Sequence, residues 1–276
     1  MRKKIFETGM MTVRRIQDPY YQGTAAELGF YFIFSIVPIL ALILQIVSRF
    51  ERVNALFARL IQAMGDSALT QSIVNSLVEV GAGKTSILFL VVALWSASKI
   101  EFSMIRMANY TYNVADPGPI GYFKARGKAI ITTVFLIVLM IVSMMVLVFG
   151  NVIVELVDQF LVDEFRTHFD FLFSLFRWPL ALMIYWLIIA LNYRMLPNRR
   201  LTFKEIIPGS LFAAVGILVA TLGYYIYLTA YSNLNIVYGS LATVIVMLLW
   251  FYWLGFILVV GMLINASWFG YGVEDD

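Results

Sequence analysis

Three ionisable residues, Lys99, Glu101 and Arg106, stand in a stretch that is otherwise rich in apolar side chains. If this stretch crosses a membrane, each ionised side chain costs about 2.5–3.5 kcal/mol even on insertion-based scales. At helical spacing Lys99 and Arg106 share a face with Trp95 and Phe102 near it, whereas Glu101 points elsewhere. The spacing thus predicts a face that lines a cavity and receives an anionic group.

A structural interpretation of the same residues stays open. Lys99 and Arg106 could extend along the helix to the cytoplasmic headgroups, and Glu101 could pair with a neighbouring helix. Glu27 poses a similar choice, because Thr24 and Glu27 have the spacing of a capping box at the start of a helix. For Glu27 we favour the cap over a cation site at an inner vestibule.

Prolines interrupt the apolar stretches at Pro38, Pro179 and Pro208-Gly209. Each proline frees backbone groups that lipid cannot satisfy, and broken helices often line the binding sites of transporters. For each proline singly, we favour a kink that packs on a neighbouring helix.

Small residues recur at steps of four and three after Pro208. Such a stripe predicts a close helix–helix contact, either within the chain or at a dimer interface. The residues are Gly209, Ala213, Gly216, Ala220 and Gly223.

Two further signals are weak. The stretch from Gly81 to Thr85 has the composition of a phosphate-binding loop, but Val78 replaces the first glycine of that motif and no strand precedes it. His168 is the only histidine and stands among acidic residues, where we favour a solvated loop over a metal site or pH switch. The chain has no cysteine, which excludes disulfides and thiolate chemistry. We therefore expect no catalytic group, no metal and no cofactor.

The composition indicates whether this chain folds in water or in a membrane. Of the 276 residues, 61% are hydrophobic and 13% are charged, and the mean hydropathy is +0.85. Soluble domains are about 25% charged, so water is a poor solvent for most of this surface. We predict an all-α polytopic membrane protein with about six transmembrane helices.

Apolar stretches of bilayer length place the spans. We predict a single six-span domain at 24–270, an amphipathic interfacial segment before it at 1–23, and a short acidic tail at 271–276. Amphipathic helices are also expected at 49–83, between the first two spans. The predicted spans are 25–48, 85–112, 129–154, 172–196, 207–231 and 236–268.

The distribution of Lys and Arg orients the spans. Basic residues concentrate before the first span and in the second-to-third and fourth-to-fifth connections, whereas the third-to-fourth connection is acidic. Both termini are therefore predicted to be cytoplasmic, and the first-to-second segment, with three arginines, fits this assignment least well. The basic residues of the two connections are Lys124, Arg126, Lys128, Arg194, Arg199, Arg200 and Lys204.

Several stretches, taken in order, resemble the YihY/BrkB family of bacterial inner-membrane proteins. The family pattern usually has a glutamate two residues after the Gly261 position, and here that residue is Leu263. The stretches are Ala25-Ala26, Phe30-Tyr31, Ser35-Ile-Val-Pro38, Trp95-Ser-Ala-Ser98, Asn109-Tyr-Thr-Tyr112, Tyr193-Arg-Met-Leu-Pro197-Asn, Pro208-Gly209, Tyr238-Gly-Ser-Leu241, Trp250-Phe-Tyr252 and Gly261 to Asn265.

The resemblance implies a bacterial inner-membrane protein of unsettled activity. Members of the family were once labelled ribonuclease BN, a label regarded as mistaken, and others are linked to serum resistance and to envelope lipid handling. With residues from these stretches, the candidates for a substrate path are Glu27, Ser35, Pro38, Ser98, Lys99, Glu101, Arg106, Asn109, Tyr238 and Asn265.

We predict a transporter or exporter that passes an amphiphilic or anionic substrate, such as a lipid, through a polar interior between spans 1, 2, 5 and 6. A non-transporting scaffold for envelope enzymes stays open, and in it the charges would be structural. A membrane-bound ribonuclease is disfavoured, because a metal-dependent nuclease needs clustered carboxylates or histidines on the cytoplasmic side. Expected partners are membrane lipids and the substrate, with self-association open and no nucleic acid.

Overall fold

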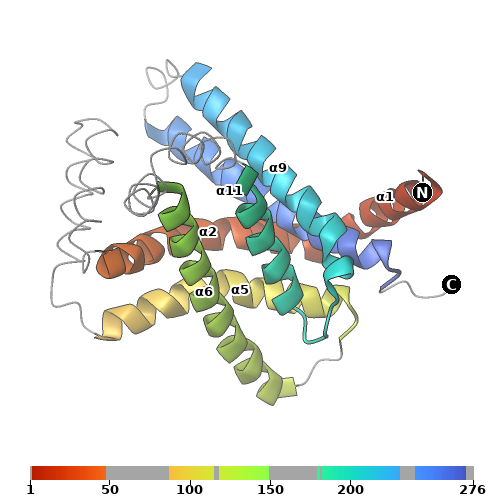
Figure 1. The fold of residues 1–276 in the computed structure, drawn as a ribbon, viewed down its shortest axis with the longest axis horizontal. Helices are drawn as coiled ribbons and strands as arrows, with labels where there is room; N and C mark the ends of the chain where they lie inside the picture. The colour runs from red at the N-terminus through yellow and green to blue at the C-terminus, as the bar shows by residue number, and fades with distance from the viewer. Residues whose placement is uncertain are drawn as a thin grey trace, which may run out of the picture.

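The structure is a computed structural model that describes residues 2–47, 87–114, 118–148, 179–180, 182–230 and 240–271. This part of the chain contains helices, turns and short connections and no strand, so the all-α prediction is confirmed for it. Figure 1 shows α2 and α5 side by side, with α6 and α11 crossing them. The helices are α1 (Arg2–Ile16), α2 (Pro19–Val47), α5 (Ile87–Thr111), α6 (Gly118–Val148), α9 (Phe203–Ala230) and α11 (Ser240–Trp268), with a shorter helix, Leu182–Met195, before α9.

The amino-terminal helix α1 packs against the end of α11 (Figure 1). Thr8 and Thr12 are buried, whereas the apolar side chains Phe6 and Met10 are exposed. Lys4 Nζ lies 5.0 Å from the ring centroid of Trp268 on α11. An exposed apolar face is what an interfacial helix presents to lipid, and the position of α1 in the headgroup layer stays a prediction.

The start of α2 corrects the predicted cap. The helix begins at Pro19, and Asp18 Oδ1 caps it by accepting from the backbone N–H of Tyr20 at 2.9 Å. Thr24 lies inside the helix, where its hydroxyl donates to the carbonyl of Tyr20 at 2.8 Å. The capping role predicted for Thr24 and Glu27 is therefore wrong, because the helix has already begun six residues before the predicted start of span 1 at residue 25.

The second and third predicted spans correspond to α5 and α6, which pack against each other. A turn follows α5, with Asn113 at a φ of 49°. Because α6 begins at Gly118, the basic residues Lys124, Arg126 and Lys128 lie on helical turns and not in an irregular connection. Arg126 and Lys128 therefore have fixed positions against neighbouring helices.

The start of α9 has a capping arrangement. Glu205 Oε2 accepts hydrogen bonds from the backbone N–H of Thr202 at 2.5 Å and from its hydroxyl at 2.8 Å. Glu205 Oε1 accepts from the hydroxyl of Tyr271, which joins the end of α11 to the start of α9.

Within the described ranges, two helices are long and apolar enough to cross a membrane, by length and composition: Phe203–Tyr227 and Ile245–Trp268. The helix Leu182–Met195 is apolar but shorter. The last two predicted spans therefore correspond to helices of spanning length. The count of about six spans stays a prediction.

Several helix ends meet at one end of the molecule, next to the basic segments. Asp18 Oδ2, before α2, accepts from the hydroxyl of Tyr110 near the end of α5 at 3.0 Å. Asn109 Oδ1 accepts from the backbone N–H of Asn198, before α9, at 2.8 Å. We call this region the polar end, and its residues are Asp18, Asn109, Tyr110, Lys128, Asn198, Glu205 and Tyr271.

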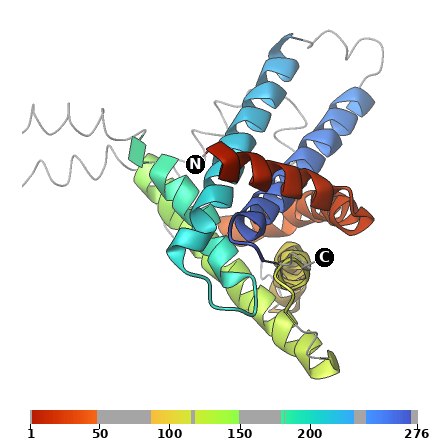
Figure 2. The same ribbon diagram turned by 90° about the vertical axis from the view of Figure 1, so that its right-hand side faces the viewer.

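α9 and α11 pack closely at Gly209 and Gly261. A Cβ added to Gly209 would lie 1.8 Å from the carbonyl oxygen of Gly261, and one added to Gly216 would lie 2.9 Å from Ile257. A Cβ at Gly223 would meet nothing within 4 Å. Figure 2 shows the two helices separating toward their other ends. The stripe of small residues thus contacts α11 along its first half.

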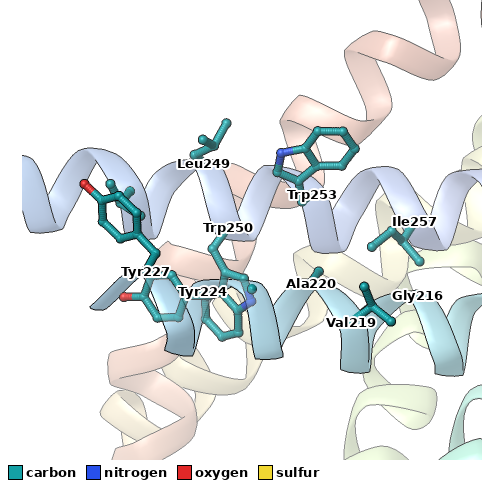
Figure 3. Close-up of a pocket in the computed structure, with 11 residues that line it drawn as sticks. Gly216, Val219, Ala220, Tyr224, Tyr227, Leu249, Trp250, Trp253 and Ile257 are labelled. Atoms are coloured by element: carbon teal, nitrogen blue, oxygen red, sulfur yellow. The ribbon is translucent and has the colours of Figure 1, made fainter. Parts of the chain in front are cut away.

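Beyond this contact the two helices leave an apolar pocket of about 460 Å³ (Figure 3). The rings of Tyr224 and Trp250 stack beside it with centroids 4.9 Å apart. Ala220 and Gly223 line the pocket, and a Cβ added to Gly223 would not touch α11 as one added to Gly209 would. Lipid or further protein is the expected neighbour of such an apolar surface in a bilayer.

Some predicted features lie outside the described residues. They are the amphipathic helices at 49–83, the stretch from Gly81 to Thr85, His168 with its acidic loop, Tyr238, and all but the first residue of the tail at 271–276.

Candidate substrate path between α2 and α5

An ion pair joins α2 to α5. Arg106 Nη2 lies 2.6 Å from Glu27 Oε1, and the Ser103 hydroxyl donates to Glu27 Oε2 at 2.9 Å. The side chains of Arg106 and Glu27 are 47% and 30% exposed. Glu27 lies about 14 Å from Asp18 at a helical rise of about 1.5 Å per residue. The ion pair therefore lies within the length of the helix bundle, and both of its side chains are partly exposed.

Lys99 lies farther along the same face of α5. Its Nζ lies 5.7 Å from the ring centroid of Tyr31 and 5.8 Å from that of Phe34, both on α2. At about 1.5 Å per residue, Lys99 is about 18 Å from the end of α5 at Thr111. Within the described residues no carboxylate lies at ion-pair distance from Lys99. Among the described residues, the contacts of the ammonium are with these two aromatic rings.

Arg126 adds a third cation beside this face. It is 5% exposed, donates to the carbonyl of Trp95 at 2.7 Å, and lies 4.0 Å over the Trp95 ring. The ring centroid of Phe102 lies 5.3 Å from the guanidinium carbon of Arg106 and 5.3 Å from that of Arg126. The sequence indicated only topology for Arg126. Lys128, two residues later, lies on nearly the opposite face of the helix, so no local spacing pointed Arg126 toward α5.

Glu101 points away from this face toward α6 and the helix Leu182–Met195. Its side chain is 5% exposed, and Oε1 accepts from Asn192 Nδ2 at 2.9 Å. The structure therefore places Lys99 and Arg106 on one face of α5, against α2, and Glu101 on a different side of α5, with an amide partner that the sequence did not indicate.

Three other polar candidates make local or connecting hydrogen bonds. Ser35 and Ser98 are buried and donate to the carbonyls of Phe32 and Trp95 in their own helices. Asn109 joins α5 to Asn198 at the polar end. Pro38 lies within α2. None of these contacts adds a charge to the path.

Asn265 lies at the crossing of α9 and α11 and not between α2 and α5. It is fully buried, and Oδ1 accepts from the backbone N–H of Gly209 at 2.6 Å. The amide thus binds a backbone group beside Pro208, as expected where proline interrupts a helix. Leu263, at the position of the family glutamate, is fully buried as well.

A basic hollow of about 660 Å³ opens at the polar end. Lys128 Nζ donates to the carbonyls of Leu196 and Pro197 and to Asn198 Oδ1 at 2.9–3.0 Å. Burial lowers the pKa of the Lys128 ammonium below its ordinary value. Three arginines complete the charge of this hollow, and they are Arg194, Arg199 and Arg200.

Metal-binding residues do not gather in the part of the chain that is described. No group of three or more His, Asp or Glu side chains lies close enough there to hold a metal ion. Two of the described carboxylates instead lie apart from each other, Glu27 with Arg106 and Ser103, and Glu101 with Asn192.

Sequence comparison extends over nearly the whole chain. The family described as Virulence factor BrkB matches residues 12–269. A ribonuclease-like protein of Bacillus subtilis, YfkH, is similar at 25% identity over 250 residues, covering 89% of each chain. No solved structure matches the chain.

Two further relatives are membrane proteins of the group UPF0761. One from Xanthomonas oryzae is 24% identical over 284 residues, which cover 99% of this chain and 64% of the relative. One from Pseudoalteromonas translucida is 30% identical over 83 residues, 30% of this chain and 28% of the relative. The chain thus spans less than two thirds of the length of these two relatives.

Proposed function

The chain belongs to the BrkB family of membrane proteins, and we propose that it transports or exports an amphiphilic or anionic substrate across the bacterial inner membrane. In this proposal it is a multi-pass carrier without catalytic activity. Membrane lipids surround it, and the substrate binds between α2 and α5.

Lys99 carries the proposal. An ionised lysine near the middle of a bilayer is costly unless its charge is used or shielded. Here Tyr31 and Phe34 flank the ammonium, and no carboxylate of the described residues pairs with it. A bound anionic group would supply the missing negative charge.

The surroundings of Lys99 suit a substrate with an apolar part. Phe30 and Phe34 on α2 are both more than half exposed. Arg106 lies on the same face of α5, nearer the polar end. A lipid-like molecule could move its anionic group between Arg106 and Lys99 while its apolar part stays against the aromatic side chains.

The polar end supports cytoplasmic placement of both termini. The start of α2, the end of α5, the start of α9 and the end of α11 all meet there. The predicted spans then alternate in direction, one starting at this side of the membrane and the next ending at it. With an even number of spans, both termini lie on the same side. The basic hollow also lies at this end, as the positive-inside rule requires of a cytoplasmic face.

The test uses purified protein in vesicles of phosphatidylethanolamine and phosphatidylglycerol. Movement of fluorescent phosphatidylglycerol between leaflets is followed by quenching of the outer leaflet. We expect the protein to accelerate this movement, and Lys99→Ala to lower the rate at least tenfold. Lys124→Ala is the matched control, because Lys124 is exposed on α6.

Two outcomes would contradict the proposal. One is a rate in protein vesicles equal to that in empty vesicles for both phosphatidylglycerol and phosphatidylethanolamine probes. The other is full activity in both Lys99→Ala and Glu101→Ala, which would make these charges structural and favour a scaffold.

A further inference from the structure

Glu101 is a carboxyl group buried inside the helix bundle. It is 5% exposed and lies about 15 Å from the end of α5 at Thr111, at about 1.5 Å per residue. Asn192 Nδ2 donates to Oε1 at 2.9 Å. Oε2 is also buried, and no donor among the described residues forms a hydrogen bond with it. One oxygen of this carboxyl thus lacks a partner.

The cations on α5 and α6 are engaged elsewhere or exposed. On α5, Lys99 lies against aromatic rings of α2 and Arg106 forms the ion pair with α2. On α6, Arg126 donates to a backbone carbonyl of α5, Lys128 donates to the backbone carbonyl of Leu196 at the polar end, and Lys124 is exposed. Within the described chain, none of them forms an ion pair with the buried carboxyl.

The other titratable and charged groups on the helix Leu182–Met195 have contacts of their own. The Tyr193 hydroxyl donates to a carbonyl of α11, Tyr185 is half-buried, and Arg194 lies over the ring of Phe203 and forms no ion pair with Glu101. On α6, the Thr132 hydroxyl lies beside the carboxyl, but it donates to carbonyls of its own helix. The surroundings therefore supply hydrogen-bonding groups and no opposite charge.

An ionised carboxylate in these surroundings is unfavourable in free energy. Removing an unpaired ion from water carries a large desolvation cost, and one amide donor does not offset that cost. A neutral carboxylic acid avoids it, because the acid carries no net charge and still accepts from Asn192. The geometry favours the protonated form.

We propose that Glu101 is a proton-binding site of the bundle interior and that it is a neutral carboxylic acid in this arrangement of α5, α6 and the helix Leu182–Met195. Asn192 positions the acid through Oε1, which leaves Oε2 as the atom that carries the proton. The helices can pack on the acid without enclosing a charge.

The same site can couple proton movement to transport, an extension that rests on the proposed function. When water reaches Oε2, the O–H bond breaks, the proton passes to the water to form hydronium, and the carboxylate keeps the electron pair. The new negative charge is unfavourable in the closed packing, so deprotonation favours an arrangement in which Glu101 faces water. Rebinding of a proton restores the closed packing.

Infrared spectroscopy of the full chain in lipid tests the proton site without any transport assay. The wild type should show the carbonyl stretch of a protonated carboxylic acid from mildly acidic to neutral pH. Glu101→Gln should lack this band, and Glu27→Gln, which removes a paired carboxylate, should keep it. A wild-type spectrum identical to that of Glu101→Gln in this region at every pH would overturn the proposal.

A hydrophobic carbodiimide provides a second measurement that needs no variant. This reagent modifies protonated carboxyls in apolar surroundings, and mass spectrometry of the peptides locates the modified residue. We expect modification of Glu101 that falls at alkaline pH. Modification of other carboxyls but not of Glu101, or protection of an ionised Glu101 by sodium ions, would contradict a proton site.

The vesicle assay separates this inference from the proposed function. An acid band with no lipid movement would leave the proton site standing and overturn the transport proposal. Lipid movement that responds to a pH gradient in wild type and Lys124→Ala, but not in Glu101→Gln, would support coupling. The same response in Glu101→Gln would overturn the coupling role.

Discussion

Glu27 on α2 and Arg106 on α5 are joined by an ion pair of 2.6 Å, and the Ser103 hydroxyl donates to the second carboxylate oxygen. The contact fixes the relative position of the two helices that flank Lys99. Since both side chains are partly exposed, its contribution to stability is expected to be modest.

The first prediction concerns the strength of this pair. Glu27→Ala and Arg106→Ala should each destabilise the protein, and the double variant should lose less than the sum, with a coupling of about 0.5–1 kcal/mol. Denaturant unfolding in detergent micelles measures the cycle. Strict additivity would mean that the pair adds nothing.

The second prediction concerns the crossing of α9 and α11. Gly209→Ala should destabilise the protein by about 2–3 kcal/mol, because its Cβ would lie 1.8 Å from the carbonyl oxygen of Gly261. Gly223→Ala is the control from the same stripe and should be neutral or stabilising by up to about 1 kcal/mol, since nothing lies within 4 Å. Equal effects of both changes on thermal unfolding would argue against the close crossing.

The third prediction distinguishes the two possible caps of α2. Asp18→Ala should cost about 1 kcal/mol, because it removes the acceptor for the Tyr20 N–H. Asp18→Asn keeps a capping oxygen and should retain most of the stability. An Asp18→Ala variant as stable as wild type would contradict the cap at Asp18.

The fourth prediction concerns Lys128. Lys128→Met should destabilise the protein by about 1–3 kcal/mol, because the carbonyls of Leu196 and Pro197 lose their donor. Lys124→Met, on the exposed side of the same helix, should change stability by less than about 0.5 kcal/mol. Thermal unfolding of both variants in detergent provides the comparison.

The fifth prediction concerns topology. The chain has no cysteine, so single cysteines at Asp66, Tyr122 and Arg200 can be labelled with a membrane-impermeant reagent. Cysteines at Tyr122 and Arg200 should react from the cytoplasmic side, and one at Asp66 from the outer side. Reaction of position 66 from the cytoplasm alone would reverse the orientation of the segment between the first two spans.

Two Thr-x-x-Glu sequences with identical spacing show that a local pattern is not sufficient to predict a helix cap. Thr24 and Glu27 have the same separation as Thr202 and Glu205, yet only the second pair caps a helix. The difference lies outside the four residues, because Asp18 and Pro19 start α2 earlier and leave Glu27 free to reach Arg106.

The sequence by itself determined the all-α fold of the described residues and the family, because hydrophobic runs and motif order are properties of the chain. It also determined that Lys99 and Arg106 share a face apart from Glu101, since helical phase follows from spacing. Only the tertiary structure decided the partners. Arg106 meets Glu27, Glu101 meets Asn192 and Asn265 meets Gly209 because separate helices pack at particular heights, and no local pattern encodes that register.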